Sequence, residues 1–153
     1  MPAEVGSPAP AFSLRNVDGE TVSLDDLKGR KSLIVFIPFP FTGTCEAELC
    51  SIRDGLADLQ RLDANVVAIT TDTVFSNRAW SEKNSFGFPV LSDFWPHGEV
   101  TMSYGTFDDR VGAANRSTYV LDADGVVRAI VATETRRMAR EFADYVSALA
   151  DIV

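Results

Sequence analysis

The two cysteines of the chain, Cys45 and Cys50, are the residues best suited to do chemistry. Cys45 follows an apolar run, residues 31–37, at the point where a helical pattern begins, so its thiol is expected near a helix start. Unpaired backbone N–H groups and the positive end of the helix dipole favour a thiolate there. Because the thiolate is the nucleophilic form, this placement predicts thiol chemistry at Cys45. On residue type alone, a small buried cysteine without reactivity is an equal alternative.

The residues just before Cys45 complete a candidate site. Pro38 and Pro40 have no backbone N–H, so they end strand pairing and shape a rigid apolar rim that limits water at the sulfur. Thr42 offers a hydroxyl that can accept a hydrogen bond near the thiol and donate one to a bound oxygen. The alternative role for this threonine is that of a helix cap and nothing more.

The spacing Pro38-x-x-x-Thr42-x-x-Cys45 at a strand-to-helix junction resembles the active-site signature of the peroxiredoxins. Arg116, just before a later strand, stands where that family uses an arginine. Residues 6–12 and 91–98 also resemble the family, and the second of these segments, together with 104–107, looks most like the AhpE group. The resemblance covers nearly the whole chain. It implies a thioredoxin-fold peroxidase for hydrogen peroxide and organic hydroperoxides, with peroxynitrite as a further candidate, and with no metal or bound cofactor.

The resemblance also implies a role for each motif residue. Cys45 would attack the terminal peroxide oxygen and become a sulfenic acid, releasing water or an alcohol. Arg116 would stabilise the thiolate and hydrogen-bond the peroxide, while Thr42 and the backbone N–H of Cys45 would hold both peroxide oxygens in line. Glu48, on the same helical face as Cys45, would orient the arginine. The alternatives are a solvated arginine at 116 and a surface glutamate at 48.

Cys50 departs from the AhpE group, which is usually described as working with one cysteine. A second cysteine five residues after the first resembles instead the PrxQ, or bacterioferritin comigratory protein, group, and it makes Cys50 the expected resolving partner of Cys45. In an intact helix the two residues lie about 7.5 Å apart along the axis and about 140° apart around it, so a disulfide requires local unwinding. The alternative is a Cys50 that never reacts, with the sulfenic acid reduced by an external thiol.

Other functions could use the same thiol. A thioredoxin-like thiol–disulfide oxidoreductase is disfavoured because the chain has no Cys-x-x-Cys. A non-enzymatic redox-sensing or holdase-type protein would differ from a peroxidase by reacting with peroxide no faster than a free thiol does. A zinc site is a poor alternative because two cysteines and the lone His97 leave its coordination shell incomplete. His97 is expected to cap or pack at the start of a short helix.

The elements that must position these residues follow from periodicity. The expected strands are residues 31–37, 65–71 and 88–91, with hairpins formed by 12–14 and 21–24 and by 118–122 and 126–131. The expected helices are residues 44–63, 73–85 and 99–104, one turn at 25–29, and a last helix with Met138, Phe142, Tyr145, Val146 and Leu149 on its apolar side. This order predicts an α/β fold, a thioredoxin-like three-layer sandwich in which helices flank a mixed β-sheet.

Length and composition agree with one globular domain spanning residues 1–153. Hydrophobic residues make up 46% and charged residues 24% of the chain, which are ordinary values. The net charge of -8 argues against nucleic acid or an anionic membrane as a main partner. Because the first residues do not resemble a signal peptide and no stretch approaches about 20 apolar residues, a reducing cytoplasm is the expected location. In that setting a cysteine pair is more often catalytic than structural.

Aromatic residues are more numerous around the candidate site than one small core needs. Some of them are expected to form a homodimer interface, since peroxiredoxins of this kind pair through the loops around the active site. The alternative is that all of them line the core or a pocket. The reductant is open between thioredoxin, a glutaredoxin-like protein and a low-molecular-weight thiol. The aromatic residues concerned are Phe39, Phe41, Trp80, Phe94 and Trp95.

Overall fold

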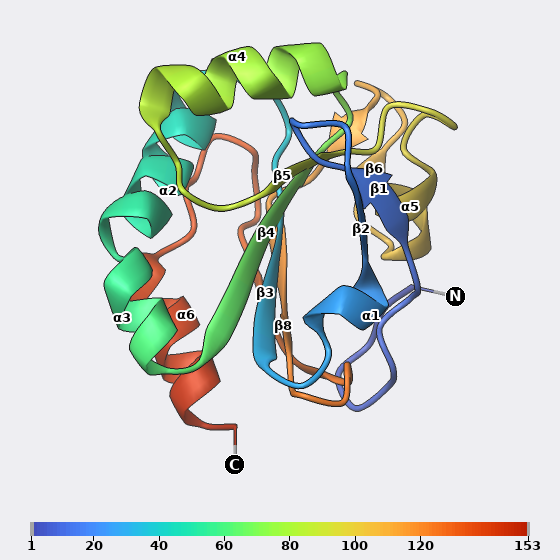
Figure 1. Ribbon diagram of the computed structural model, residues 1–153. Coiled ribbons are helices and arrows are strands. Elements are labelled where there is room, and N and C mark those ends of the chain that lie inside the picture. The colour runs from blue at the N-terminus through green and yellow to red at the C-terminus, as the bar shows by residue number, and fades with distance from the viewer. Residues whose placement is uncertain (1, 153) are drawn as a thin grey trace.

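The centre of the molecule is a seven-stranded mixed sheet (Figure 1). A computed structural model describes residues 2–152. The strands of this sheet are β1 (Ser13–Arg15), β2 (Thr21–Ser23), β3 (Lys31–Phe36), β4 (Ala64–Thr70), β5 (Val90–Ser92), β8 (Ser117–Leu121) and β9 (Val127–Ala132). Their order is β2–β1–β5–β4–β3–β8–β9, with β3, β4 and β5 parallel and the outer pairs antiparallel. Two short strands, β6 (Phe107–Asp108) and β7 (Ala113–Ala114), pair separately and were not predicted.

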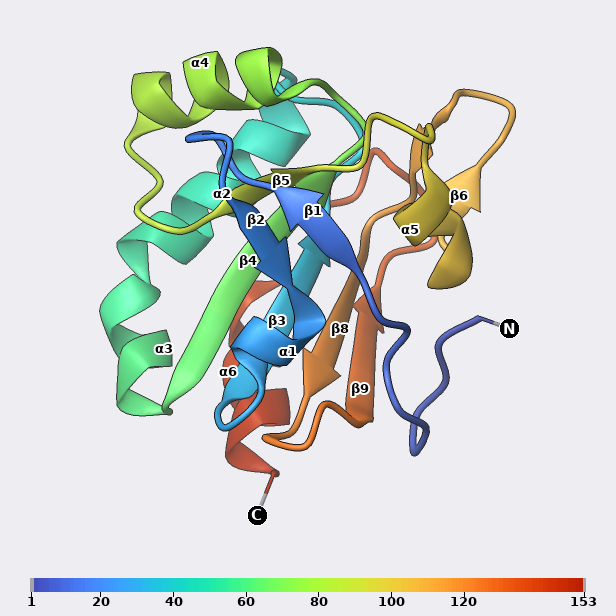
Figure 2. The ribbon, with the colours of Figure 1, turned by 45° about the vertical axis from the view of Figure 1, so that its right-hand side comes forward.

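Helices cover both faces of the sheet. They are α1 (Leu24–Leu27), α2 (Gly43–Asp54), α3 (Leu56–Arg61), α4 (Val74–Asn84), α5 (Glu99–Ser103) and α6 (Phe142–Ala150). Helices α2, α3, α4 and α6 pack on one face, whereas α1 and α5 pack on the other (Figures 1 and 2). The thioredoxin-like three-layer sandwich expected from the sequence is therefore confirmed.

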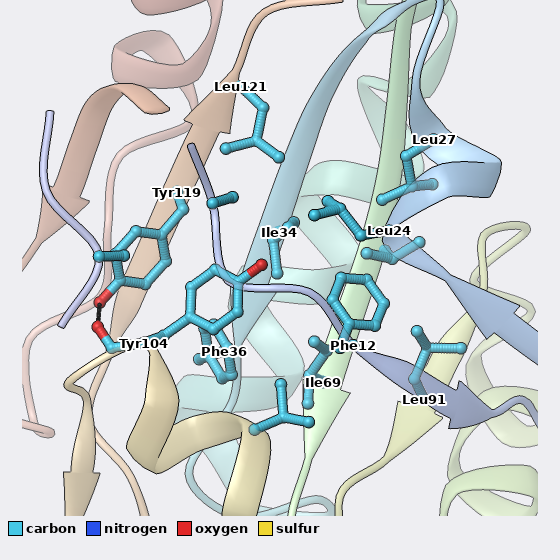
Figure 3. Packing of buried hydrophobic residues seen from close by; sticks show 14 of the residues in the cluster. Phe12, Leu24, Leu27, Ile34, Phe36, Ile69, Leu91, Tyr104, Tyr119 and Leu121 are labelled. Atoms are coloured by element: carbon cyan, nitrogen blue, oxygen red, sulfur yellow. Dashed lines mark hydrogen bonds between the residues drawn. The ribbon is translucent and has the colours of Figure 1, made fainter. Parts of the chain in front are cut away.

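Strand β3 shows how the sequence builds the two cores. Successive side chains of a strand point to opposite faces. Leu33 and Val35 accordingly pack under α2, α4 and α6, while Ile34 and Phe36 pack in the opposite cluster, drawn in Figure 3. In that second cluster the Tyr119 hydroxyl donates a hydrogen bond of 2.8 Å to the backbone oxygen of Tyr104. Because both faces of β3 are buried, the strand that leads into the candidate site is firmly held.

Two of the predicted helices have other limits than expected. The predicted continuous helix 44–63 is wrong, because the chain breaks at Gly55 into α2 and α3. The ring of Phe142 lies against Gly55, and a Cβ on residue 55 would come within 2.3 Å of it. Met138 is also not on the apolar face of the last helix, since α6 begins only at Phe142 and the Met138 side chain is exposed.

The start of α4 agrees with the sequence. The Thr73 side chain accepts a hydrogen bond of 3.2 Å from the backbone N–H of Ser76, so the predicted cap is confirmed. The helix ends at Asn84, and Ser85 follows in the left-handed conformation with a φ of 50°. Within residues 2–152 no helix combines the length and apolar character needed to cross a membrane.

Candidate active site

The candidate site begins in the loop that joins β3 to α2. Pro38 and Pro40 are buried in this loop, whereas Phe39 and Phe41 between and beside them are exposed. Phe41 adopts a φ of 65°, which non-glycine residues rarely do. The two prolines restrict φ at residues 38 and 40 and so limit the backbone path into the first turn of α2.

Cys45 lies in the first turn of α2 and its side chain is fully buried, with 0% exposed area. It belongs to the apolar cluster under the helices, together with Leu49 and Ile52 of the same helix. Cys45 therefore lies at the N-terminus of α2, where backbone N–H groups lack helical partners.

Thr42 occupies the position before the helix, but its hydroxyl does not act as a cap. The hydroxyl instead donates a hydrogen bond of 2.7 Å to the backbone oxygen of Phe39. The cap-only alternative is therefore wrong. With its hydrogen engaged in this way, the Thr42 oxygen is left to accept a hydrogen bond from a bound O–H group.

Glu48, one turn after Cys45, is the centre of a buried ionic network, so the surface-glutamate alternative is wrong. Its side chain is 1% exposed and accepts hydrogen bonds from two arginines. Arg116 donates through Nη1 to Oε1 of Glu48. Arg140 donates its backbone N–H at 2.7 Å and its Nε at 2.8 Å to Oε2, and its Nη2 at 3.0 Å to Oε1. The network brings both guanidinium groups to the side of α2 that carries Glu48.

The charges of this network control the ionisation of Glu48. Burial raises the pKa of its carboxyl group, but the hydrogen bonds and charge of Arg140 and the charge of Arg116 outweigh that effect and lower the pKa below its usual value. Glu48 is therefore an anion shared by two cations. One of them, Arg116, is held a second time, because its Nε donates a hydrogen bond of 2.6 Å to the backbone oxygen of Arg136.

Arg140 was missed by the sequence reasoning. It lies just before α6, in a stretch that the sequence pattern assigns to the last helix, and its side chain is fully buried. Its Nη1 donates at 3.1 Å to Oγ1 of Thr118, which in turn shares a 3.1 Å hydrogen bond with the Tyr145 hydroxyl. The concentration of arginines at 136, 137 and 140 is a weak signal for this role, since it does not indicate which side chain turns inward.

Cys50 lies on a different face of α2, in contact with α4. Its side chain is half-buried, and its Sγ donates a hydrogen bond of 3.8 Å to Oδ1 of Asn84. Glu46, one turn earlier, accepts hydrogen bonds of 3.1 Å from the indole N–H of Trp80 and from Nδ2 of Asn84. These bonds, together with Lys83, lower the pKa of Glu46 despite partial burial. Both cysteines are thiols within one unbroken helix, so forming a disulfide between them requires rearrangement.

The aromatic residues singled out from the sequence divide into two groups. Trp80 is fully buried in the core. The other four are exposed to 40% at Phe39, 51% at Phe41, 46% at Phe94 and 82% at Trp95. The alternative that all five line the core or a pocket holds for Trp80 in the core and for Phe94 and Trp95, which line a groove, and it stays a prediction for Phe39 and Phe41.

His97 packs against aromatic rings at the start of α5. Its ring lies between those of Phe94 and Phe107, with Nδ1 3.2 Å from the backbone oxygen of Phe94 and Nε2 2.8 Å from that of Gly112. It lies at the start of α5, as expected. Across residues 2–152, histidine, cysteine and carboxylate side chains form no group of three that could hold a metal ion.

Comparison with known proteins identifies the family. The family model described as "AhpC/TSA family" matches residues 5–130, so the chain belongs to this family. Alkyl hydroperoxide reductase E of Mycobacterium tuberculosis is 42% identical over 125 residues, which cover 81% of this chain and 82% of that protein. The putative peroxiredoxin bcp of Coxiella burnetii is 34% identical over 136 residues, covering 85% and 89%. The crystal structure of peroxidoxin BcpB from Mycobacterium tuberculosis matches with a TM-score of 0.88 and 26% identity, covering 99% of each chain.

These relatives define the activity. The chain is a peroxiredoxin with AhpE-like and PrxQ-like features, and it is a thiol-dependent peroxidase. Its substrates are accordingly a peroxide and a thiol reductant. The expected enzyme class is confirmed. The alternative of a non-enzymatic redox-sensing or holdase-type protein is therefore not supported.

Proposed function

We propose that Cys45 is the nucleophile of this peroxidase. Its thiolate attacks the terminal peroxide oxygen and the O–O bond breaks, so that Cys45 becomes a sulfenic acid and the leaving hydroxide or alkoxide takes a proton from solvent to become water or an alcohol. The observation that carries this proposal is the position of Arg116. Arg116 is hydrogen-bonded to Glu48, which lies three residues after Cys45 on the same helix. An arginine there supplies positive charge to the thiolate and to the oxygens on which charge develops.

Thr42, Pro38 and the start of α2 complete the proposed peroxide site. The Thr42 oxygen, whose own hydrogen is bound to Phe39, accepts the O–H of the peroxide. The backbone N–H of Cys45 donates to the second peroxide oxygen. Pro38 is buried beside them and keeps water away from the sulfur. Together these groups align the peroxide with the attacking sulfur, which is the main requirement for a fast displacement.

Glu48 acts in this scheme as a positioning residue. Two hydrogen-bonded partners fix Arg116 at both ends of its guanidinium, namely Glu48 and the backbone oxygen of Arg136. Arg140 balances the remaining negative charge of Glu48. Arg116 is therefore preorganised, and it loses little side-chain freedom when the peroxide binds.

Cys50 is proposed to resolve the sulfenic acid by forming a disulfide with Cys45. The alternative is a one-cysteine cycle in which an external thiol reduces the sulfenic acid directly. The half-buried position of Cys50 favours the first route, because a short unwinding of α2 exposes its thiol. A reducing cytoplasm suits this cycle, since the disulfide must be reduced in every turnover. Thioredoxin, a glutaredoxin-like protein and a low-molecular-weight thiol are the candidate reductants.

Two measurements test the catalytic roles. Stopped-flow tryptophan fluorescence of the reduced protein mixed with hydrogen peroxide is expected to show a fast first phase, which Cys45→Ser abolishes and Cys50→Ser retains. Intact-mass analysis after one equivalent of peroxide is expected to show a loss of two hydrogens, the mass of a disulfide. A first phase as slow as that of a free thiol contradicts Cys45 as the nucleophile. An added oxygen on Cys45 with Cys50 still free contradicts only the resolving role.

Hydrogen peroxide and organic hydroperoxides are the proposed substrates, with peroxynitrite as a further candidate. The name alkyl hydroperoxide reductase of the M. tuberculosis relative supports the organic class. The exposed rings of Phe39 and Phe41 beside the site offer apolar surface to an alkyl group. A comparison of second-order rate constants for hydrogen peroxide and cumene hydroperoxide tests this preference, and Phe41→Ala is expected to lower only the second of the two.

A homodimer is proposed from the exposed aromatic side chains. Phe75 and Trp95, each 82% exposed, lie at a groove of about 660 Å³ between the start of α4 and the loop after β5. Phe94 lines the same groove, and such contiguous apolar surface is typical of interfaces. Sedimentation velocity at micromolar concentration is expected to give a dimer that Trp95→Glu dissociates. A monomer in both reduced and oxidised wild-type protein contradicts the proposal.

A further inference from the structure

Asn84, the last residue of α4, makes several contacts with α2 and has no role yet in the catalytic scheme, whereas Trp80 and Lys83 of the same helix reach only Glu46. Asn84 is half-buried and meets three residues spaced along one face of α2. Its Nδ2 donates a hydrogen bond of 3.1 Å to Oε1 of Glu46, and its Oδ1 accepts the Cys50 thiol at 3.8 Å. Its backbone oxygen accepts a hydrogen bond of 2.7 Å from Nη1 of Arg53. One residue therefore spans α2 from the turn of Cys45 to the turn after Cys50.

The chemistry of the neighbours fixes the orientation of the Asn84 amide. The Glu46 carboxylate can only accept hydrogen bonds, so the NH₂ group must face it. The same Nδ2 also donates at 3.1 Å to the backbone oxygen of Trp80. With its NH₂ group held by two acceptors, the amide presents its oxygen to the thiol of Cys50. Asn84 thus binds Glu46 and Cys50 at once, and it can do so only while α2 is helical between them.

We propose that Asn84 is a positioning residue that sets the rate at which Cys50 forms a disulfide with Cys45. This inference rests on the proposed function, in which Cys50 resolves the sulfenic acid. In the step concerned, the Cys50 sulfur attacks the sulfur of the Cys45 sulfenic acid. The S–O bond breaks as the S–S bond forms, and the departing hydroxyl takes the Cys50 proton to leave as water.

The contact must break before this step because the two cysteines point away from each other in the helix. Residues five apart are about 7.5 Å apart along the axis and about 140° apart around it. Unwinding the segment from Cys45 to Cys50 separates Cys50 and Glu46 from Asn84, whose own backbone remains part of α4. The Asn84 contacts therefore stabilise the state with a closed helix, in which the sulfenic acid waits unresolved. Their strength decides how often the helix opens.

Removing the Asn84 side chain is expected to speed up resolution. Each hydrogen bond contributes a modest net stabilisation to the closed helix, so Asn84→Ala should raise the rate of disulfide formation about 5- to 20-fold. Sulfenic acid formation should stay within about twofold of wild type, because Asn84 contacts none of Thr42, Cys45 and Arg116. In excess peroxide the variant should also accumulate less sulfinic acid, because faster resolution removes the sulfenic acid before a second peroxide reaches it.

Two further variants separate positioning from packing. Asn84→Leu keeps the side-chain volume but removes the hydrogen bonds, so it should accelerate resolution as Asn84→Ala does. Glu82→Ala is the matched control, since it breaks an exposed pair with Arg78 on the same helix without touching α2. It should leave the rates of both steps and the sulfinic acid yield at wild-type values. A purely structural role of Asn84 would give a lower Tm without changing the ratio of disulfide to sulfinic acid.

Rapid mixing with hydrogen peroxide, acid quenching, thiol alkylation and intact-mass analysis follow each species in time. The inference is supported if both Asn84 variants form the disulfide faster than wild type and Glu82→Ala does not. It is overturned if the disulfide forms at the wild-type rate in Asn84→Ala, or if Asn84→Leu behaves as wild type. If wild type forms the sulfenic acid but never the disulfide, the resolving role of Cys50 fails and this inference fails with it. The absence of any fast sulfenic acid formation would instead overturn the nucleophilic role of Cys45.

Discussion

Helix α2 is held in two different ways on two of its faces. On one face Glu48 pairs with Arg116 and Arg140, and the three side chains are between 0% and 4% exposed. On the other face Glu46 and Cys50 meet Asn84 across partly open surface, and the Glu46 side chain is 30% exposed. The first contact consists of buried charges, whereas the second consists mainly of single hydrogen bonds at the edge of the protein.

This difference indicates which part of the helix can move. Separating a buried ion pair leaves uncompensated charge in the interior, which is strongly unfavourable. A half-exposed hydrogen bond can exchange its partner for water at a modest net change in free energy. The face of α2 that carries Glu48, here the Glu48 face, is therefore suited to hold the peroxide site. The face of α2 that carries Glu46 and Cys50 and contacts Asn84, here the Asn84 face, is suited to release Cys50. The same helix can serve both steps of the proposed cycle.

The largest expected effect is on the Glu48 face. Glu48→Ala leaves Arg116 and Arg140 buried without their carboxylate, so it should lower the free energy of unfolding by about 3–5 kcal/mol. Urea denaturation followed by circular dichroism measures this change. Glu82→Ala, which removes an exposed glutamate of α4, is the matched control and should have little effect. A Glu48→Ala variant as stable as the control would contradict the assignment of this face as the rigid one.

The next effect concerns the rate of peroxide reduction. Arg116→Met removes the positive charge beside the proposed nucleophile, so the second-order rate constant with hydrogen peroxide should fall about 10²- to 10³-fold. Arg61→Met is the control, because the Arg61 side chain is 76% exposed and pairs with Asp58 on α3. Stopped-flow fluorescence of both variants makes the comparison. Equal rate constants in the two variants would show that the Glu48 network positions no catalytic group.

A smaller effect is expected in the dependence of stability on pH. Because the pKa of Glu48 is lowered in the folded protein, its stabilisation is complete above its usual value near 4.5 and is lost as the pH falls through the lower, folded value. The Tm of wild type should therefore drop below about pH 4.5 more steeply than that of Glu48→Gln. Differential scanning calorimetry between pH 7 and pH 3 measures both slopes. Parallel curves would mean that Glu48 does not lose its charge in that range.

The smallest effect should come from the Asn84 face. Glu46→Gln keeps an acceptor oxygen for the indole N–H of Trp80, and this side chain is partly in water. The Tm at pH 7 should change by less than half as much as it does in Glu48→Gln. Thermal unfolding of the two variants under identical conditions gives the ratio. A larger loss in Glu46→Gln would reverse the order of the two faces.

Most of the fold was predictable because periodicity and turn residues agree along the chain. Both interior strands, the Asp122–Gly125 hairpin and the cap at Thr73 came from local pattern alone. The break at Gly55 was missed although glycine weakens a helix, and the ring of Phe142 that lies against residue 55 is distant in sequence and could not be inferred from the local pattern. The assignment of one domain to the whole chain stays a prediction.

The site was predictable only in part, for a similar reason. The spacing of Pro38, Thr42 and Cys45 is local, and the resemblance to peroxiredoxins added Arg116. Arg140 and Asn84 reach α2 from other elements, and the periodicity of α2 carries no information about which polar residue will face it. Local spacing therefore indicated the proposed nucleophile, whereas the groups that hold its helix required the three-dimensional structure.

The contact between Gly55 and Phe142 bears on how quickly the enzyme can be ready for another turnover. The ring of Phe142 packs where α2 ends, so we expect the unwinding of a disulfide cycle to stop there and to involve at most the 12 residues of α2. A peptide helix of about 20 residues relaxes in roughly 0.1–1 μs, and a shorter segment need not be slower. Rewinding should thus be over long before the next reductant or peroxide molecule arrives. The turnover time is then governed by encounters in solution and by bond chemistry, and the sheet never has to be rebuilt.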